Sequence, residues 1–138
     1  MSSHDERRET GDAELREREQ MTVLRAQIAH AKAHSPAFGR ILQDVDPEAI
    51  DDRGALARIP VTRKSALVEL QKGARPFGGL ATTRWGAAAR VFASPGPIFE
   101  PEGRATDYWR FARALFAAGF REGDLVHNCF SYHFTPGG

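Results

Sequence analysis

The chain has 138 residues, about the length of one domain, and its 41% hydrophobic and 27% charged residues are typical of a globular protein. Lys and Arg number 19 against 18 Asp and Glu, and the net charge of +1 gives no strong field to attract nucleic acid or anionic lipid. No apolar run approaches the ~20 residues of a membrane-spanning helix, and the charged N-terminus lacks the apolar core of a secretory signal. We therefore expect a cytoplasmic protein with no nucleic acid and no membrane as partner.

The first part of the sequence predicts a charged tail and then a long helix. Residues 1–12 mix both signs of charge with almost nothing apolar, so we expect them to form a disordered tail. Apolar residues then recur at near-helical spacing over residues 13–34, and Arg, Glu, Gln and Lys fill most positions between them. This pattern predicts an amphipathic helix.

Shorter helices are expected to complete a helical N-terminal segment over residues 13–70. Pro36 can open a second helix with Ser35 as its cap, and Asp46-Pro47 breaks it. Thr62 has the chemistry of an N-cap, so we expect a further helix from this residue through Leu70.

The remaining sequence predicts the start of a parallel sheet. Residues 71–88 contain several glycines and little periodicity, as is typical of a surface connection. A strand, a Pro/Gly loop, a helix and a second strand are then expected at residues 89–94, 95–103, 105–118 and 125–130. Residues 89–138 would therefore form one βαβ crossover.

Such a unit is incomplete as a fold. A parallel pair of strands with one crossover helix leaves faces and edges that need partners, and it is too small to be stable alone. The sequence also ends in the glycine-rich run Thr135-Pro136-Gly137-Gly138. We therefore expect a truncated α/β protein, in which a helical N-terminal segment packs on a larger sheet supplied by the remainder of its own chain.

Four short motifs in order carry a family resemblance. They are Ile59-Pro60-Val61-Thr62-Arg63-Lys64, Arg90-Val91-Phe92-Ala93-Ser94-Pro95-Gly96, Gly123-Asp124-Leu125-Val126-His127-Asn128 and Ser131-Tyr132-His133-Phe134-Thr135-Pro136-Gly137-Gly138. From about residue 13 to the end, the chain resembles the phenylacetate-CoA ligase branch of the AMP-forming, acyl-adenylate ligases. The resemblance implies that residues 89–138 begin the large AMP-binding domain of an adenylate-forming enzyme. It also implies ATP, Mg²⁺ and CoA as cofactors of the whole enzyme, and an aromatic or other small carboxylic acid as its substrate.

The resemblance implies a phosphate-binding loop after the first strand, and this loop departs from the family pattern. Of its residues, only Ser94 and Gly96 match the motif, and they are our candidate nucleotide-binding residues. Glu100 falls where the family has a lysine, and three prolines that lack an N–H donor occupy the loop, namely Pro95, Pro97 and Pro101. The alternative is that Pro and Gly only shape a surface turn.

The last motif matches a stretch that borders the acyl pocket in the family. The resemblance therefore makes Tyr132, Phe134 and Gly137 candidate substrate-binding residues, because such a pocket needs apolar walls. The alternative is that the two aromatic rings are ordinary core residues.

A metal site and a thiol nucleophile are two further possibilities in the same region. His127, Cys129 and His133 are potential metal ligands, but the sequence offers no fourth ligand at a zinc-site spacing, and we predict no metal site. Cys129, the only cysteine, is expected to be a small buried residue. No orienting group for a Cys129–His133 nucleophile pair is identifiable, so we assign no catalytic residue.

Two functional hypotheses follow. In the first, the chain is the N-terminal part of an ATP-dependent acid-CoA ligase and is inactive as this fragment. In the second, it is a degenerate, non-catalytic binding or assembly module that has lost its ATP contacts.

Overall fold

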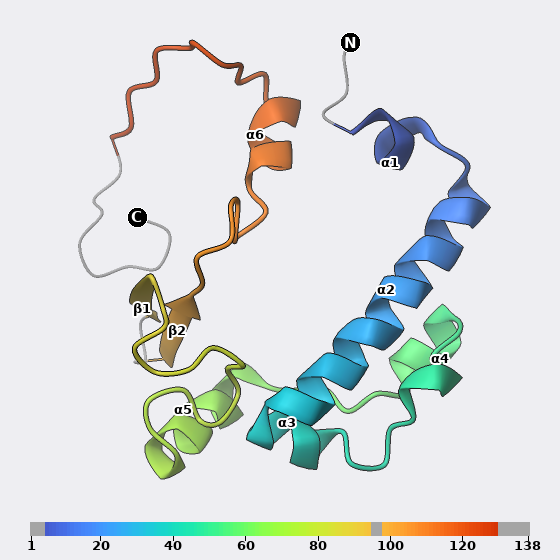
Figure 1. Cartoon of the computed structure of the whole chain (residues 1–138), viewed down its shortest axis with the longest axis vertical. Helices are drawn as coiled ribbons and strands as arrows, with labels where there is room; N and C mark the ends of the chain where they lie inside the picture. The colour runs from blue at the N-terminus through green and yellow to red at the C-terminus, as the bar shows by residue number, and fades with distance from the viewer. Residues whose placement is uncertain (1–4, 95–97, 130–138) are drawn as a thin grey trace.

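The computed structural model describes residues 5–94 and 98–129. In these ranges the chain forms α1 (Glu6–Thr10), α2 (Ala13–His34), α3 (Pro36–Ile41), the 3-10 turn η1 (Pro47–Ala49), α4 (Arg53–Ala57), α5 (Lys64–Gly73), β1 (Arg90–Ser94), β2 (Ile98–Glu102) and α6 (Ala112–Ala117). The long helix α2 runs along one side of the molecule (Figure 1). The elements α3, α5 and the hairpin lie toward one end, and α1 and α6 lie toward the other (Figure 1).

The helices begin where the sequence supplies cap residues. Asp12 accepts a hydrogen bond from the N–H of Leu15 at 2.7 Å at the start of α2, and Asp52 accepts one from Ala55 at 2.6 Å at the start of α4. Each bond satisfies a backbone donor that has no partner within the helix. The predicted helix over 13–34 is confirmed to the residue.

A cluster of buried apolar residues lies where α2, α3, η1 and α4 meet. Its buried members are Ile28, Leu42, Ile50 and Ala55, and partly buried apolar side chains pack around them. Polar contacts from two side chains hold α2 against the residues after α3 and against α4. Lys32 donates from Nζ to the carbonyl oxygens of Gln43 and Val45 at 2.9 and 2.6 Å, and Arg53 forms a bidentate pair with Glu17 at 2.7 Å for both bonds.

Helix α5 begins later than the sequence predicted. Its N-cap residue is Arg63, and no side chain caps the helix, so the prediction of Thr62 as cap is wrong. The helix also continues past Leu70 to Gly73. Three extra residues of helix place Gln71 against β2, and this contact provides a reason for the extension.

The segment after α5 is packed against the helices and is not only a surface connection. Phe77 is buried, and the carbonyl oxygen of Gly79 accepts a hydrogen bond from the N–H of Ala37 at 3.0 Å and one from Ser35 Oγ at 2.7 Å. Gly79 has φ of +70°, a conformation that L side chains rarely adopt. The glycine therefore lets the chain turn close to the start of α3.

The sheet of the described residues is an antiparallel hairpin. Strand β1 pairs with β2, and the register runs from Arg90 opposite Glu102 to Ser94 opposite Ile98. The predicted loop over 95–103 therefore contains a strand, and the predicted parallel pair within a βαβ crossover is wrong for this region. Proline at position 101 is compatible with this strand because a two-stranded hairpin has only edge strands. The mixed helix-and-sheet class of the prediction is confirmed.

The crossover helix predicted for residues 105–118 is much shorter. Asp107 and Arg110 have φ of 50° and 56°, which interrupts a helix before α6. Asp107 Oδ1 accepts hydrogen bonds from the N–H groups of Phe111 and Ala112 at 2.8 and 3.1 Å and so marks the start of the short helix. Within 118–129 the structure contains no strand, contrary to the strand predicted from residue 125.

Residues 5–12, which we expected to form part of a disordered tail, include the short helix α1. Asp5 caps α1 by accepting a hydrogen bond from the N–H of Arg8 at 3.2 Å. Ion pairs then tie α1 to other elements: Arg7 pairs with Glu19 on α2, and Glu9 pairs with Arg113 on α6 at 3.1 Å. Arg7 and Glu9 thus have partners in other helices, whereas Arg8 pairs with Asp5 within the same segment.

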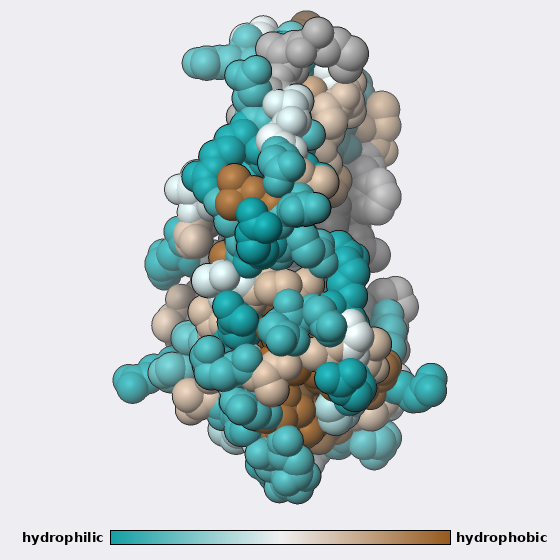
Figure 2. Space-filling model, turned by 90° about the vertical axis from the view of Figure 1, so that its right-hand side faces the viewer, coloured by the Kyte–Doolittle hydropathy of each residue, from teal (hydrophilic) through white to brown (hydrophobic). Residues whose placement is uncertain are grey.

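The face that carries α2 is mostly hydrophilic, with apolar residues in small separate patches (Figure 2). Helix α2 buries only Met21 and Ile28, and its other residues are exposed or partly buried. No helix in the described part of the chain is both long and apolar enough to cross a membrane.

Candidate functional site

Ser94 is the last residue of β1, so the hairpin places it next to the predicted phosphate-binding loop. Its hydroxyl donates to the carbonyl oxygen of Ile98 at 3.5 Å, which is the long limit for a hydrogen bond. The side chain is therefore a partly exposed and weakly engaged donor. Gly96, the second predicted nucleotide-binding residue, lies outside the described residues.

Glu100 lies in the middle of β2, opposite Phe92 of β1. The residue is half-buried, and no ion pair to it occurs among residues 5–94 and 98–129. A carboxylate at this position repels a polyphosphate, as the sequence indicated. Among the described residues of the predicted loop, Ser94 offers a hydroxyl group and Glu100 a carboxylate.

The hairpin is anchored to α5 through one side chain. Gln71 Nε2 donates to the carbonyl oxygen of Phe99 at 2.9 Å, and the N–H of Phe99 donates to Gln71 Oε1 at 2.8 Å. The amide of Gln71 thus behaves like a further residue of a neighbouring strand, and it is buried at 7% exposure. Because both groups of Phe99 are satisfied, the outer edge of β2 is closed at this point.

At the other end of the hairpin, Glu102 gathers three donors. Its Oε1 accepts from Arg90 Nη2 at 2.6 Å and from Arg90 Nε at 3.2 Å, and its Oε2 accepts from the indole N–H of Trp109 at 3.0 Å. The hydrogen bonds from Arg90 and then Trp109 hold the pKa of Glu102 below its ordinary value. Glu102 in turn raises the pKa of Arg90.

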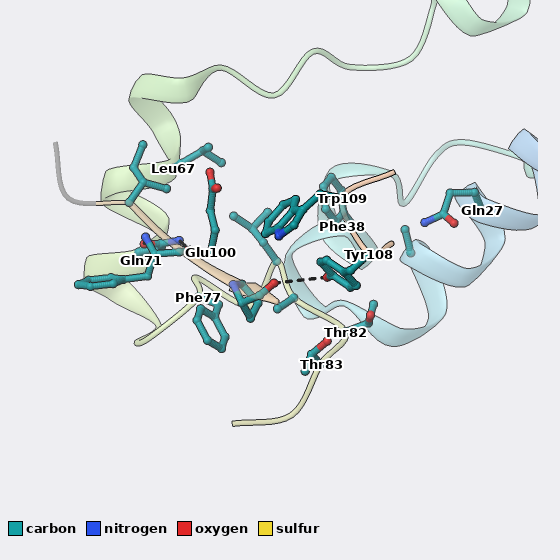
Figure 3. A pocket seen from close by; sticks show the side chains of 16 residues that line it. Gln27, Phe38, Leu67, Gln71, Phe77, Thr82, Thr83, Glu100, Tyr108 and Trp109 are labelled. Atoms are coloured by element: carbon teal, nitrogen blue, oxygen red, sulfur yellow. Dashed lines mark hydrogen bonds between the residues drawn. The ribbon is translucent and has the colours of Figure 1, made fainter. Parts of the chain in front are cut away.

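Trp109 and Tyr108 cover this end of the hairpin. The Trp109 ring lies edge-on to Phe92 at 6.0 Å between centroids and edge-on to Tyr108 at 5.1 Å. Tyr108 donates from its hydroxyl to the carbonyl oxygen of Pro101 at 3.3 Å (Figure 3). The two aromatic residues therefore close the hairpin and do not extend a crossover helix.

A cavity of about 350 Å³ lies between the hairpin, α5 and the helices α2 and α3 (Figure 3). Its lining is mainly apolar and aromatic, with four polar residues that bear no charge and one carboxylate: Gln27, Ala31, Phe38, Leu67, Gln71, Phe77, Leu80, Ala81, Thr82, Thr83, Ile98, Phe99, Glu100, Pro101, Tyr108 and Trp109. The sequence analysis did not predict this cavity. The adjacent aromatic residues Tyr108 and Trp109 were its only local signal.

The other predicted site residues fall into two groups. Tyr132, Phe134 and Gly137, with His133, lie outside the described residues. His127 and Cys129 are exposed, so the prediction of a buried cysteine is wrong. Within the described ranges no group of three or more His, Cys, Asp or Glu side chains could hold a metal ion.

Comparisons with known proteins give the class of the fold. No protein-family model matches the chain. The structure matches a crystal structure of 2-hydroxyisobutyryl-CoA ligase in the postadenylation state in complex with 2-HIB-AMP, with a TM-score of 0.77, 26% identity, and coverage of 90% of this chain and 29% of that one. A second structure of this ligase, in complex with 2-HIB-AMP and CoA in the thioesterification state, matches 71% of the chain with a TM-score of 0.65 and 26% identity; this match covers 22% of that chain. The fold is that of the N-terminal part of an adenylate-forming ligase.

Sequence comparison identifies relatives among the phenylacetate-coenzyme A ligases. The chain is 32% identical over 126 residues to the phenylacetate-coenzyme A ligase of Thermus thermophilus. This match covers 83% of this chain and 27% of that enzyme. It is 30% identical over 128 residues to the phenylacetate-coenzyme A ligase of Aromatoleum evansii, with 86% and 28% coverage. The chain is therefore related to the phenylacetate-CoA ligases, as its motifs indicated, and it spans little more than a quarter of the length of these relatives.

Proposed function

We propose that this chain provides the N-terminal part of an ATP-dependent acid-CoA ligase of the phenylacetate-CoA ligase type. In such a reaction the carboxylate of the acid attacks the α-phosphate of ATP to form an acyl-adenylate and release pyrophosphate. The CoA thiolate then displaces AMP to form the thioester. The observation that carries the proposal is the match of 90% of the chain, at a TM-score of 0.77, to a ligase in complex with an acyl-adenylate.

The candidate residues have distinct roles under this proposal. Ser94 and Gly96 would contact the nucleotide phosphates, and Mg²⁺ would offset the phosphate charge. Tyr132, Phe134 and Gly137 would border a small carboxylic acid, aromatic or otherwise. The proposal places the reaction in the cytoplasm, where a single unpaired cysteine remains reduced.

The chain alone is proposed to be inactive as a ligase. It spans 27% of the length of the Thermus thermophilus relative, and adenylation and thioester formation both need donors and cations at the reacting phosphate and acyl oxygens. The test is an assay of the purified chain with ATP, Mg²⁺, CoA and phenylacetate, in which we expect no thioester. Formation of phenylacetyl-CoA would contradict this proposal.

A second candidate function is a non-catalytic binding or assembly module, and Glu100 is the observation that favours it. Titration calorimetry with ATP and Mg²⁺ distinguishes the two candidates when the chain is compared with its Glu100→Lys variant and with Glu122→Lys as a control for added charge. Binding by the unmodified chain supports the ligase. Binding by Glu100→Lys alone supports the module, because the carboxylate is then what prevents nucleotide binding. Absence of binding by every variant would contradict the roles given to Ser94 and Gly96.

A further inference from the structure

The cavity beside the hairpin has an unusual combination of lining residues. Five of them are aromatic, namely Phe38, Phe77, Phe99, Tyr108 and Trp109, and Glu100 is the single charged residue among the described residues that line it. These side chains come from α3, from the segment after α5, and from β2 with the residues that follow it (Figure 3). Elements far apart in the sequence therefore build one surface of aromatic character with one negative charge.

Glu100 forms no ion pair with any residue that the structure describes. Seven ion pairs occur among the described residues, and none involves Glu100, whereas Glu102 two positions later is paired with Arg90. The side chain is also half-buried, so water solvates it only in part. A partly desolvated carboxylate gains from an opposite charge at short range and disfavours an anion.

The aromatic rings, like the Glu100 carboxylate, favour a positively charged ligand. The face of an aromatic ring is negative, and a cation within about 6 Å of its centroid is attracted, most strongly by Trp. Two of the rings are held in place before any ligand arrives, because Trp109 donates to Glu102 at 3.0 Å and Tyr108 donates to the carbonyl oxygen of Pro101 at 3.3 Å. Rings that are already held lose little conformational entropy on binding.

We propose that this cavity binds a small organic cation, an ammonium compound with an aromatic or aliphatic body. The ammonium group lies against the carboxylate of Glu100, and the body lies against the aromatic rings and Ile98. This site adjoins the nucleotide site proposed at Ser94 and includes Glu100 of the same loop, and its ligand has the charge opposite to that of a carboxylic acid substrate.

The test uses three probes of similar size, with 2-phenylethylammonium as the cation, 2-phenylethanol as its uncharged isostere and phenylacetate as the anion. Each is titrated into the purified chain and followed by calorimetry and by the NMR signal of the Trp109 indole N–H. We expect the ammonium to bind about tenfold or more tightly than the alcohol, because hydrogen bonds to charged groups contribute about 1.5–3 kcal/mol. Equal binding of the three probes, or tighter binding of phenylacetate, would overturn the proposal.

Two variants locate the binding. Glu100→Gln keeps the size of the side chain and is expected to remove the preference for the ammonium, whereas Glu122→Gln, an exposed change away from the cavity, is expected to retain it. If Glu100→Gln retains the preference, the proposal fails. Circular dichroism checks the fold of each variant, and if Glu100→Gln is unfolded, the decision rests on the three probes with the unmodified chain. Because no probe requires ATP, CoA or turnover, the outcome is independent of ligase activity.

Discussion

Ser35 donates a hydrogen bond of 2.7 Å from its hydroxyl to the carbonyl oxygen of Gly79, a residue 44 positions further along the chain. The same hydroxyl accepts a hydrogen bond from the N–H of Phe38 at 3.2 Å and so caps α3. Ser35 has 1% exposure, which excludes water as a replacement partner. One small side chain therefore both starts a helix and holds the segment that leads to the hairpin.

The first prediction concerns this hydroxyl. Ser35→Ala removes a helix cap and a buried hydrogen bond, and we expect the free energy of unfolding to fall by about 1–3 kcal/mol. Urea denaturation measures this change. Ser65→Ala is the control, because Ser65 is exposed within α5 and should change the unfolding free energy very little. Equal losses in both variants would contradict the role given to Ser35.

The second prediction uses two glycines whose replacement should have opposite effects. In Gly79→Ala the new Cβ lies 3.4 Å from the N atom of Ala37, and φ of +70° strains any L side chain, so we expect a loss of about 1–2 kcal/mol. Gly73 ends α5, and a Cβ added there meets no surrounding atom within 4 Å, so Gly73→Ala should leave stability unchanged or raise it by up to about 1 kcal/mol. Thermal or urea denaturation of both variants measures whether each substitution lowers or raises the free energy of unfolding.

The third prediction concerns the anchor between α5 and β2. Gln71→Ala leaves the N–H and C=O groups of Phe99 without their partners, and we expect the unfolding free energy to fall by about 1–3 kcal/mol. The amide proton of Phe99 should also exchange faster with deuterium than it does in the unmodified chain. Gln20→Ala, an exposed change on α2, is the matched control. Unchanged exchange at Phe99 in the Gln71 variant would show that this anchor is not formed in solution.

The fourth prediction is a pH dependence that comes from Glu102. Its folded-state pKa is lowered from 4.5 by the hydrogen bonds from Arg90 and Trp109, so its contribution to stability is fully present above the unfolded value and is lost as the pH falls through the folded value. Glu17, which Arg53 holds at a lowered pKa, acts in the same direction. We expect the unfolding free energy to fall as the pH drops below 4.5, and to fall less steeply in Glu102→Gln. Glu122→Gln should follow the unmodified chain, and identical slopes in all three proteins would contradict the prediction.

The helical half of the fold was predictable because its signals are local. Asp12, Ser35 and Asp52 each cap a helix through a bond to a residue three positions away, and Pro36 occupies the first turn of α3. Such signals depend on a few neighbouring residues and need no knowledge of the rest of the fold. Thr62 shows the limit of this reasoning, because a suitable cap residue does not cap α5 when the helix begins two residues later.

The hairpin was not predictable because distant residues determine it. Proline at 101 and glycine at 103 are typical of a loop, yet β2 is held by Gln71 from α5 and by the pairing of Glu102 with Arg90. The helix predicted for 105–118 was too long for a related reason. Trp109 packs on Phe92 and donates to Glu102, and this tertiary packing competes with helix propensity.

The candidate site was predictable only in part. Motif reasoning from the family pattern located Ser94 and identified Glu100 as a departure, and both lie on the hairpin. The cavity was not predictable because its residues extend from Gln27 to Trp109, and no short motif records that they lie together. A single sequence shows the chemistry of each residue but not this long-range proximity.

The ion pair between Glu9 and Arg113 joins helices 104 residues apart in sequence, and both partners are in contact with water. Exposed pairs are weak and are screened by salt, since the Debye length shrinks from about 10 Å at 0.1 M to about 3 Å at 1 M ionic strength. This weak ion pair links α1 to α6, so its loss would allow the two helices to move apart. The chain is therefore expected to change its dimensions with ionic strength while its helical content stays constant, so that scattering and circular dichroism would respond differently to the same salt.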